Sequence, residues 1–242
     1  MSRRLPTTES EPKTSSPVRS PVERARPGAV REGNSPFLKR APAQARGDRS
    51  VRRVLEACEA LLAEQPFEEI TVEGIARRAD VPVSSMYFFF NDRLSIFFRL
   101  IEVTLDQIAD EYVLTERVLN QPLSAFVRNL ERRLARIWAQ HKHMLDLFFS
   151  YRVHPSVLPM VIRLQKYVDA QLFRKLTHDF PSLNATRRQA LARVINGNLM
   201  QGLDIAAGMS PQKVRAFQVE WSGMLHAHLH SLDNDHSPRG DR

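Results

Sequence analysis

The amino-acid sequence predicts an all-α fold, and two features of its 242 residues support this class. From residue 48 onward, apolar residues recur at spacings of three and four, which is the period of amphipathic helices. No segment shows the alternating pattern of a strand, and there is no internal repeat or coiled-coil heptad. The caps and breaks within this pattern predict about nine helices.

The composition excludes several classes of protein. Cys58 is the single cysteine, so neither an intrachain disulfide framework nor a zinc site built on several thiolates is available. No apolar run approaches the roughly 18 residues of a membrane-spanning helix, and the Arg/Pro/Ser-rich N-terminus lacks the apolar core of a secretory signal. We therefore expect a cytoplasmic protein with no membrane partner. The net charge of +8 suits a polyanionic partner but does not identify one.

The positive charge is concentrated in two segments. Residues 1–50 hold 11 basic and 5 acidic side chains, and residues 151–200 hold 8 and 2, whereas residues 51–100 hold 6 and 8. Residues 1–47 also contain seven of the 15 prolines and few large apolar residues, so they cannot bury enough surface to offset their ordering entropy. We expect a disordered basic arm over 1–47 and a disordered tail over 233–242. The arm is either an inert extension or a flexible element that tracks DNA phosphates.

Residues 48–98 are expected to form a separate domain of four helices. Apolar residues line one face of each predicted helix, while short polar side chains precede the helices and proline or aspartate lies between them. The predicted N-caps are Asp48, Thr71 and either Asn91 or Asp92, and the predicted breaks are Pro66 and Ala79–Pro82.

Residues 71–90 have the layout of a helix-turn-helix: a helix of about two turns, a tight turn, and a second short helix, called the reading helix below. A larger pattern surrounds this layout at fixed spacing. It consists of Thr71, Val72, Ile75, Ala76, Ala79, Val81, Met86, Tyr87, Phe90, Arg93 and Ile96. Through this pattern, residues 49–98 resemble the N-terminal signature of the TetR family of repressors. The resemblance implies a DNA-binding regulator whose residues 99–232 form a helical domain for regulation and dimerisation.

Three positions depart from the usual pattern of the family. Asp80 stands in place of the turn glycine, Pro82 in place of a serine, and Arg93 in place of a lysine. Aspartate tolerates a left-handed backbone better than most residues, and proline suits the start of a helix. Arginine keeps the positive charge of lysine and adds bidentate phosphate geometry.

The resemblance assigns DNA contacts residue by residue. Thr71, Tyr87 and Arg93 are expected on phosphates, and Thr71 has the alternative role of capping its helix. Base edges are expected to meet the outward side of the reading helix, where Phe88 and Phe89 are alternatives for the exposed position. The candidate base-reading residues are Val83, Ser84, Ser85 and Phe88. That helix contains no Arg, Lys, Asn or Gln, so we expect phosphate contacts, DNA shape and the basic arm to carry much of the affinity.

The resemblance also implies partners: a palindromic double-stranded DNA operator bound by a homodimer, and a small-molecule effector held in the C-terminal domain. Polar groups within apolar helix faces are the candidate effector contacts, with ordinary core packing as the alternative. They are Trp138, Met144, Phe148, Tyr151, Tyr167, Asn198 and Asp204. Large apolar faces and small residues suggest the dimerisation candidates, with intrachain packing as the alternative. They are Gly202, Phe217, Trp221, Met224 and Leu225. Few acids occur in residues 151–200, which favours an anionic or apolar effector over a polycation.

Catalytic patterns are missing from the sequence. No two glycines have the G-x-G spacing of nucleotide-binding loops, and neither a G-x-S-x-G nor an H-E-x-x-H motif occurs. His226 and His230 are four residues apart, and we expect solvated or interface positions for them rather than a metal site. We therefore expect no enzymatic activity and no cofactor, but a transcriptional repressor released by its ligand. A non-specific basic nucleic-acid-binding protein and a helical enzyme are the alternatives.

Overall fold

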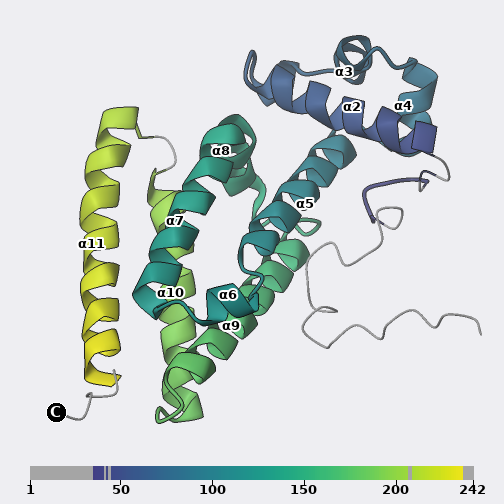
Figure 1. Cartoon of the computed structure of the whole chain (residues 1–242). Coiled ribbons are helices and arrows are strands. Elements are labelled where there is room, and N and C mark those ends of the chain that lie inside the picture. Colours follow the sequence, from purple (N-terminus) through teal and green to yellow (C-terminus); the bar gives the residue numbers. More distant parts are fainter. Residues whose placement is uncertain (1–34, 41, 43–44, 207–208, 237–242) are drawn as a thin grey trace, which may run out of the picture.

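The computed structural model describes residues 35–40, 42, 45–206 and 209–236. Within these ranges the chain forms ten α-helices and one short 3-10 helix, with no strand, so the all-α prediction is confirmed. A small group of helices lies at one end of the molecule, and one long helix, α5, runs from this group into a larger bundle (Figure 1).

The small group forms where the sequence places short amphipathic segments between breaks. Its helices bury their apolar faces against one another, and α3 packs on α2 and α4. Val54 and Cys58 of α2 and Ile75 of α3 are almost completely buried. The elements are α2 (Ala45–Leu62), the 3-10 helix η1 (Phe67–Glu69), α3 (Val72–Ala79) and α4 (Val83–Phe89).

The connecting helix α5 (Arg93–Glu111) begins with a capping box. Asp92 Oδ1 accepts a hydrogen bond from Ser95 N at 2.7 Å, and Ser95 Oγ accepts one from Asp92 N at 3.1 Å. These bonds satisfy backbone donors that the start of a helix leaves without partners. Of the two N-caps predicted for this helix, Asp92 is therefore the one used. α5 packs on α2 near its start and on α7, α8 and α9 further along, so both parts of the fold share it.

The larger bundle contains six helices, of which α9 and α10 pack closely and α11 lies at one edge beside α7 and α10 (Figure 1). α6 is a single turn that the sequence did not predict. The buried Lys175 holds the connection after this turn, because its Nζ donates to Leu119 O at 2.9 Å and to Gln121 O at 2.6 Å. The helices are α6 (Glu116–Leu119), α7 (Leu123–Gln140), α8 (Lys142–Tyr151), α9 (Leu158–Asp179), α10 (Ala185–Ala206) and α11 (Pro211–His236).

Some helix boundaries differ from the prediction. α2 begins at Ala45, so Asp48 lies in its first turn and is not the N-cap. Ala45 and Arg46 are strong helix formers, and the helix begins at them although Gly47, between them and Asp48, is a weak one. α9 begins at Leu158 rather than at His154, because the intervening residues form turns that bond back to His154 O. α11 continues to His236, past the predicted end at residue 232.

The packed part of the chain also begins earlier than the predicted start at residue 48. Residues 35–40 lie against the small group of helices, and Phe37 is only 8% exposed. Its ring centroid is 5.6 Å from that of Phe98 in α5, in an edge-on arrangement. The burial of this one aromatic side chain accounts for the order of residues 35–40, which composition alone assigns to the disordered arm. The predicted arm over residues 1–34 lies outside the described residues, as does most of the tail over 233–242.

The single cysteine is a core residue. Cys58 is fully buried in α2, and this burial, aided by the neighbouring Glu59 carboxylate, raises the pKa of its thiol to about 12. The thiol therefore stays protonated at neutral pH. In the described part of the chain, no helix has both the length and the apolar character needed to cross a bilayer. The same residues bring together no group of three or more His, Cys, Asp or Glu side chains that could hold a metal ion.

Candidate nucleic-acid interface

The turn between α3 and α4 has a left-handed residue where the sequence has aspartate. Asp80 adopts φ 49° and ψ 52°, a conformation that glycine accepts freely and aspartate tolerates. Val81 N donates to Ala76 O at 3.0 Å, which closes the end of α3. Arg53 of α2 donates to Asp80 O at 3.0 Å and to Asp80 Oδ2 at 2.8 Å. These contacts hold the angle between α3 and α4 without the glycine.

The reading helix α4 exposes three large apolar side chains on a helix of seven residues. Val83 is 38% exposed, Tyr87 46% and Phe88 47%, whereas Phe89 is buried in the small core. Phe88 therefore faces outward, as its choice as the base-reading candidate requires. Exposed aromatic and β-branched side chains gathered on one short helix are typical of a surface that meets a partner.

The two serines of the reading helix occupy different positions. Ser84 is exposed to solvent, while Ser85 is half-buried one residue further along. Both lie in the first half of α4, which is the part of a recognition helix that approaches base edges. The outward side of this half therefore consists of Val83 and Ser84, with Ser85 at its margin.

Thr71 is the N-cap of α3. Its Oγ1 accepts a hydrogen bond from Gly74 N at 3.0 Å, and the side chain is exposed. This is the alternative role, capping of its own helix, that was predicted for Thr71. A phosphate contact through the same hydroxyl or through the start of α3 stays a prediction.

Arg93 makes contacts within the chain that the sequence did not predict. Its Nη1 donates to three backbone carbonyl oxygens around η1: those of Phe67 at 2.9 Å, Glu68 at 2.8 Å and Ile70 at 2.7 Å. The guanidinium carbon also lies 4.4 Å from the centre of the Phe67 ring. Arg93 thus ties the start of α5 to the connection between α2 and α3, and its expected phosphate contact stays a prediction.

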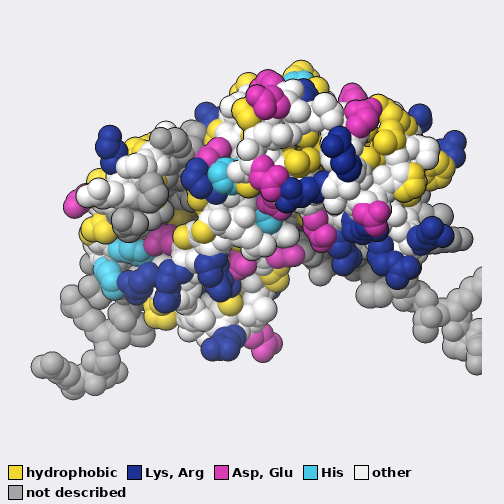
Figure 2. All heavy atoms as spheres, turned by 90° about the horizontal axis from the view of Figure 1, so that it is seen from above, with side chains coloured by type: hydrophobic (Ala, Val, Ile, Leu, Met, Phe, Trp, Pro, Cys, Tyr) yellow, Lys and Arg dark blue, Asp and Glu magenta, His cyan; other side chains and the backbone are white. Residues whose placement is uncertain are grey.

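Positive side chains surround this group of helices. Figure 2, which looks down on this end of the molecule, shows Lys and Arg side chains at several places on the part of the surface where α2, α3 and α4 lie. Arg49, Arg52 and Arg77 are exposed there, whereas Arg53 and Arg78 pair with acids. An exposed apolar helix flanked by cations suits a duplex, whose bases lie between two rows of phosphates.

A family model described as "Bacterial regulatory proteins, tetR family" matches residues 54–100. These residues span most of α2, the helix-turn-helix of α3 and α4, and the first part of α5. The chain therefore carries the DNA-binding domain of the TetR family of transcriptional regulators. Members of this family act by binding DNA and not by catalysis, which confirms the expectation of a non-enzymatic protein. No curated protein sequence matches the chain.

Solved structures, some of them described as TetR-family regulators, share the fold at low sequence identity. A putative regulator from Mesorhizobium loti is 17% identical, with a TM-score of 0.58, over 76% of this chain and 98% of its own. GusR from Salmonella enterica is 14% identical, with a TM-score of 0.59, over 76% of this chain and 95% of its own. A regulator from Aquifex aeolicus is 18% identical, with a TM-score of 0.53, over 74% of this chain and 99% of its own. At such identities the likeness concerns the fold alone.

The candidate effector contacts of this TetR-family protein do not converge on one cavity. Trp138 and Phe148 line a cavity of about 400 Å³ between α5, α7, α8, α9 and α10. Met144 and Tyr167 are buried in the core, which agrees with the alternative of ordinary core packing. Tyr151 packs on the rings of Phe67, Phe97 and Phe98. Asn198 lines a different cavity, and the side chain of Asp204 lies outside the described residues.

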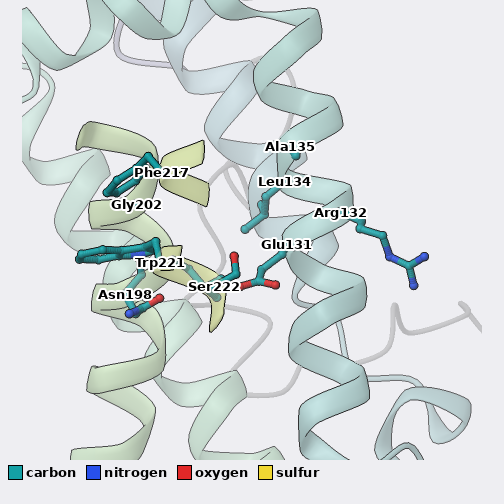
Figure 3. A pocket seen from close by; sticks show the side chains of 10 residues that line it. Glu131, Arg132, Leu134, Ala135, Asn198, Gly202, Phe217, Trp221 and Ser222 are labelled. Carbon is teal, nitrogen blue, oxygen red and sulfur yellow. The ribbon is translucent and has the colours of Figure 1, made fainter. Parts of the chain in front are cut away.

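The second cavity, of about 230 Å³, lies between α7, α10 and α11 and includes three of the dimerisation candidates (Figure 3). Trp221 stacks on Phe217, and its Nε1 donates to Asn198 O at 3.0 Å. A Cβ on Gly202 would lie only 2.7 Å from Trp221 Nε1, so this glycine makes room for the indole within the chain. Leu225 is also buried in the chain, and of the five candidates only Met224 is largely exposed, at 62%.

The sequence missed several residues of both surfaces. Arg152, Asn196 and Gln201 line the larger cavity together with Leu105, although they lie far apart in the chain. No spacing rule connects positions on different helices, so only the packing of the bundle brings them together. Arg40, which lies near α4, was not predicted as an individual DNA contact, although it belongs to the basic segment of residues 1–47.

We predict that Arg93 stabilises the DNA-binding domain. The change Arg93→Met removes three charge-assisted hydrogen bonds to carbonyl groups and should lower the free energy of unfolding by about 2 kcal/mol. Urea denaturation followed by circular dichroism measures this difference. The matched control Arg52→Met removes an exposed arginine of α2 and should change the unfolding free energy by less than about 0.5 kcal/mol. Equal effects of the two changes would contradict the structural role of Arg93.

Proposed function

We propose that this TetR-family protein is a repressor that binds a palindromic DNA operator as a homodimer and leaves it when a small ligand fills the C-terminal domain. The observation that carries the proposal is the outward side of α4, where Val83, Tyr87 and Phe88 are exposed beside a well-defined helix-turn-helix turn. A helix-turn-helix places such a second helix in the major groove.

The chemistry of α4 suggests how it reads a half-site. Val83 and Phe88 offer apolar surface to thymine methyl groups, and Ser84 or Ser85 offers a hydroxyl that both donates and accepts. The exposed Tyr87 offers its hydroxyl to a phosphate at the edge of the groove. Long polar side chains that make bidentate base contacts are missing from α4, so we expect the sequence preference to come from methyl contacts and DNA shape.

A homodimer would place two reading helices on the two halves of a palindrome. We propose that α10 and α11 form the dimer interface. Both carry large apolar side chains that the chain itself does not cover: Val194 is 55% exposed, Val219 70% and Met224 62%. Nothing lies within 4 Å of a Cβ built on Gly223, so another helix could approach α11 closely there.

The larger cavity is the proposed effector site. Its walls are mostly apolar and aromatic, and among the described residues they include Arg152 but no carboxylate. Asn196 donates to Asp169 Oδ1 at 2.7 Å, while its own Oδ1 is buried with no hydrogen-bond partner in the described chain. A buried acceptor without a partner is costly, and a ligand donor would satisfy it. The site suits a largely apolar ligand with one anionic group and one hydrogen-bond donor.

Helix α8 is suited to transmit the presence of the ligand. Leu145 and Phe148 line the cavity on one side of this helix. At its C-terminal end, Tyr151 packs on Phe97 with ring centroids 5.5 Å apart. Before its first residue, the buried His141 contacts the Glu59 carboxylate of α2 through Nδ1. A ligand that displaces α8 would therefore act on both α2 and α5, which hold the reading helix.

A footprint on DNA tests the repressor function. Purified protein on its own upstream region, with competitor DNA at physiological salt, should protect one palindromic site. Tyr87→Phe should weaken binding to all sequences alike, whereas Ser85→Ala should alter base preference. The affinity and the base preference of each variant are both measured by titrating the protein onto the palindrome and onto variant palindromes. Uniform coating of the DNA would favour a protein that binds nucleic acid without sequence preference. No binding at all would contradict both the repressor function and the non-specific alternative.

The dimer interface is tested by charge on α11. The double variant Val219→Glu/Met224→Glu should be monomeric, because a two-fold interface would bring four buried carboxylates together. Light scattering coupled to size-exclusion chromatography measures the mass. Val153→Glu, at a side chain that is 72% exposed outside these helices, is the control and should leave the dimer intact. A wild-type monomer, or a dimeric double variant, would contradict this interface.

A matched pair of probes tests the effector site. Anilinonaphthalene sulfonate carries one anionic group, and N-phenyl-1-naphthylamine is an uncharged analogue. Arg152→Met should weaken binding of the sulfonate about tenfold and leave the uncharged probe unaffected. The control Arg128→Met, at an exposed position of α7, should change neither. Fluorescence titration gives both affinities, and equal loss for both probes would show that Arg152 supports the fold rather than the ligand.

A further inference from the structure

The segment of residues 35–40, called the anchor segment below, is fixed to the helix-turn-helix. Phe37 fills an apolar site beside Phe98, and Lys39 N donates to Phe89 O at 2.8 Å. Phe89 is the last residue of α4, so this bond satisfies one of the carbonyl groups that a helix end leaves without a partner. Backbone and side chain together therefore hold the anchor segment against the C-terminal end of the reading helix.

A second contact attaches the anchor segment to α5. Ser35 is buried, and its Oγ donates to Glu102 Oε2 at 2.5 Å. The same carboxylate oxygen accepts from Arg99 Nη1 at 2.6 Å, so the buried Glu102 is paired and its charge is compensated. The anchor segment is thus held at both ends, by α5 at Ser35 and by α4 at Lys39.

This attachment places two cations beside α4. The guanidinium carbon of Arg40 lies 4.9 Å from the centre of the exposed Phe88 ring, a cation–π contact that holds Arg40 at the reading helix. Lys39 and Arg40 are both exposed, and neither forms an ion pair with any other described residue. The negative end of the α4 dipole favours positive charge at this position.

We propose that the anchor segment is a second DNA-binding element, in which Lys39 and Arg40 contact phosphates beside the groove that α4 enters. This inference rests on the proposed DNA-binding function. The first residues of a recognition helix contact base edges. Lys39 and Arg40, attached at the last residue of α4, therefore lie at the margin of the groove, where phosphates are the nearest groups.

The charge of the domain explains why such an element is needed. Residues 51–100 hold 6 basic and 8 acidic side chains, and α4 has no lysine or arginine. Phosphate contacts supply most of the salt-dependent affinity for DNA. Two cations fixed next to α4 add that affinity with little loss of conformational entropy, because the anchor segment is ordered before DNA binds.

Binding of the full chain to the palindrome found by footprinting, measured at several salt concentrations, tests the proposal. Arg40→Met and Lys39→Met remove one charge each, and methionine keeps an unbranched apolar side chain at each position. Each change should weaken binding about fivefold at 0.15 M salt and reduce the salt slope by about 0.9, since about one counterion is released per contact. The loss should be equal on variant palindromes, because phosphates carry no sequence information.

Two further variants separate charge from structure. Arg40→Lys keeps a point charge at the same place and should retain most of the salt slope. Arg117→Met removes an exposed arginine in α6, far from α4, and should leave affinity and slope unchanged (Figure 1). Thermal unfolding of each variant shows whether the domain remains intact.

The outcomes distinguish this proposal from the proposed function. If the wild-type chain binds its palindrome while Arg40→Met and Lys39→Met bind it with unchanged affinity and slope, the anchor segment does not contact DNA and the repressor proposal stands. The same conclusion follows if Arg40→Lys loses as much slope as Arg40→Met. If the wild-type chain protects no palindrome, the proposed function itself fails, and this proposal fails with it.

Discussion

The burial of α5 between two parts of the fold is the constraint on which the rest of the structure depends. Near its start, Phe97 and Phe98 form an aromatic cluster with Phe67 before α3 and Tyr151 at the end of α8. Further along, Leu105 and Ile108 form part of the wall of the larger cavity. Because protein interiors are close-packed, a shift of this helix cannot be absorbed on one side alone. The DNA-binding helices and the proposed effector site therefore share one mechanical element.

The reading helix shows a different compromise, between apolar surface and charge. α4 exposes Val83 and Phe88 to water in the free protein, which is unfavourable. A partner that covers these side chains would remove this cost. It carries no cation of its own, so attraction to DNA has to come from neighbouring elements. Arg77 on α3 and Arg40 in the anchor segment lie in such positions. In the proposed complex, separating the cations from the reading surface would leave α4 to discriminate between bases by shape and methyl contacts.

Much of the small domain could be predicted because its signals are local. Asp92 as a helix cap, the left-handed tolerance of Asp80 and the apolar stripe of α3 depend on neighbours a few residues away. Contacts across the chain could not be predicted in this way. Arg93 was expected on DNA because its position matches a family pattern, but its Nη1 bonds to backbone carbonyl oxygens of a connection more than 20 residues earlier. Likewise Gly202 was expected at a dimer interface, and the structure uses it to admit Trp221 of the same chain.

The sequence by itself determined the all-α class, the helix-turn-helix between residues 71 and 90 and the TetR-family pattern of the DNA-binding domain. These follow from helical periodicity, caps and fixed spacing, all of which are local patterns in the sequence. Only the tertiary structure decided which polar residues line a common cavity, which phenylalanine of α4 faces solvent, and that Phe37 anchors a basic segment beside α4. The reason is physical: such contacts join residues on different helices, and their energies depend on packing and burial that no local pattern of residues specifies.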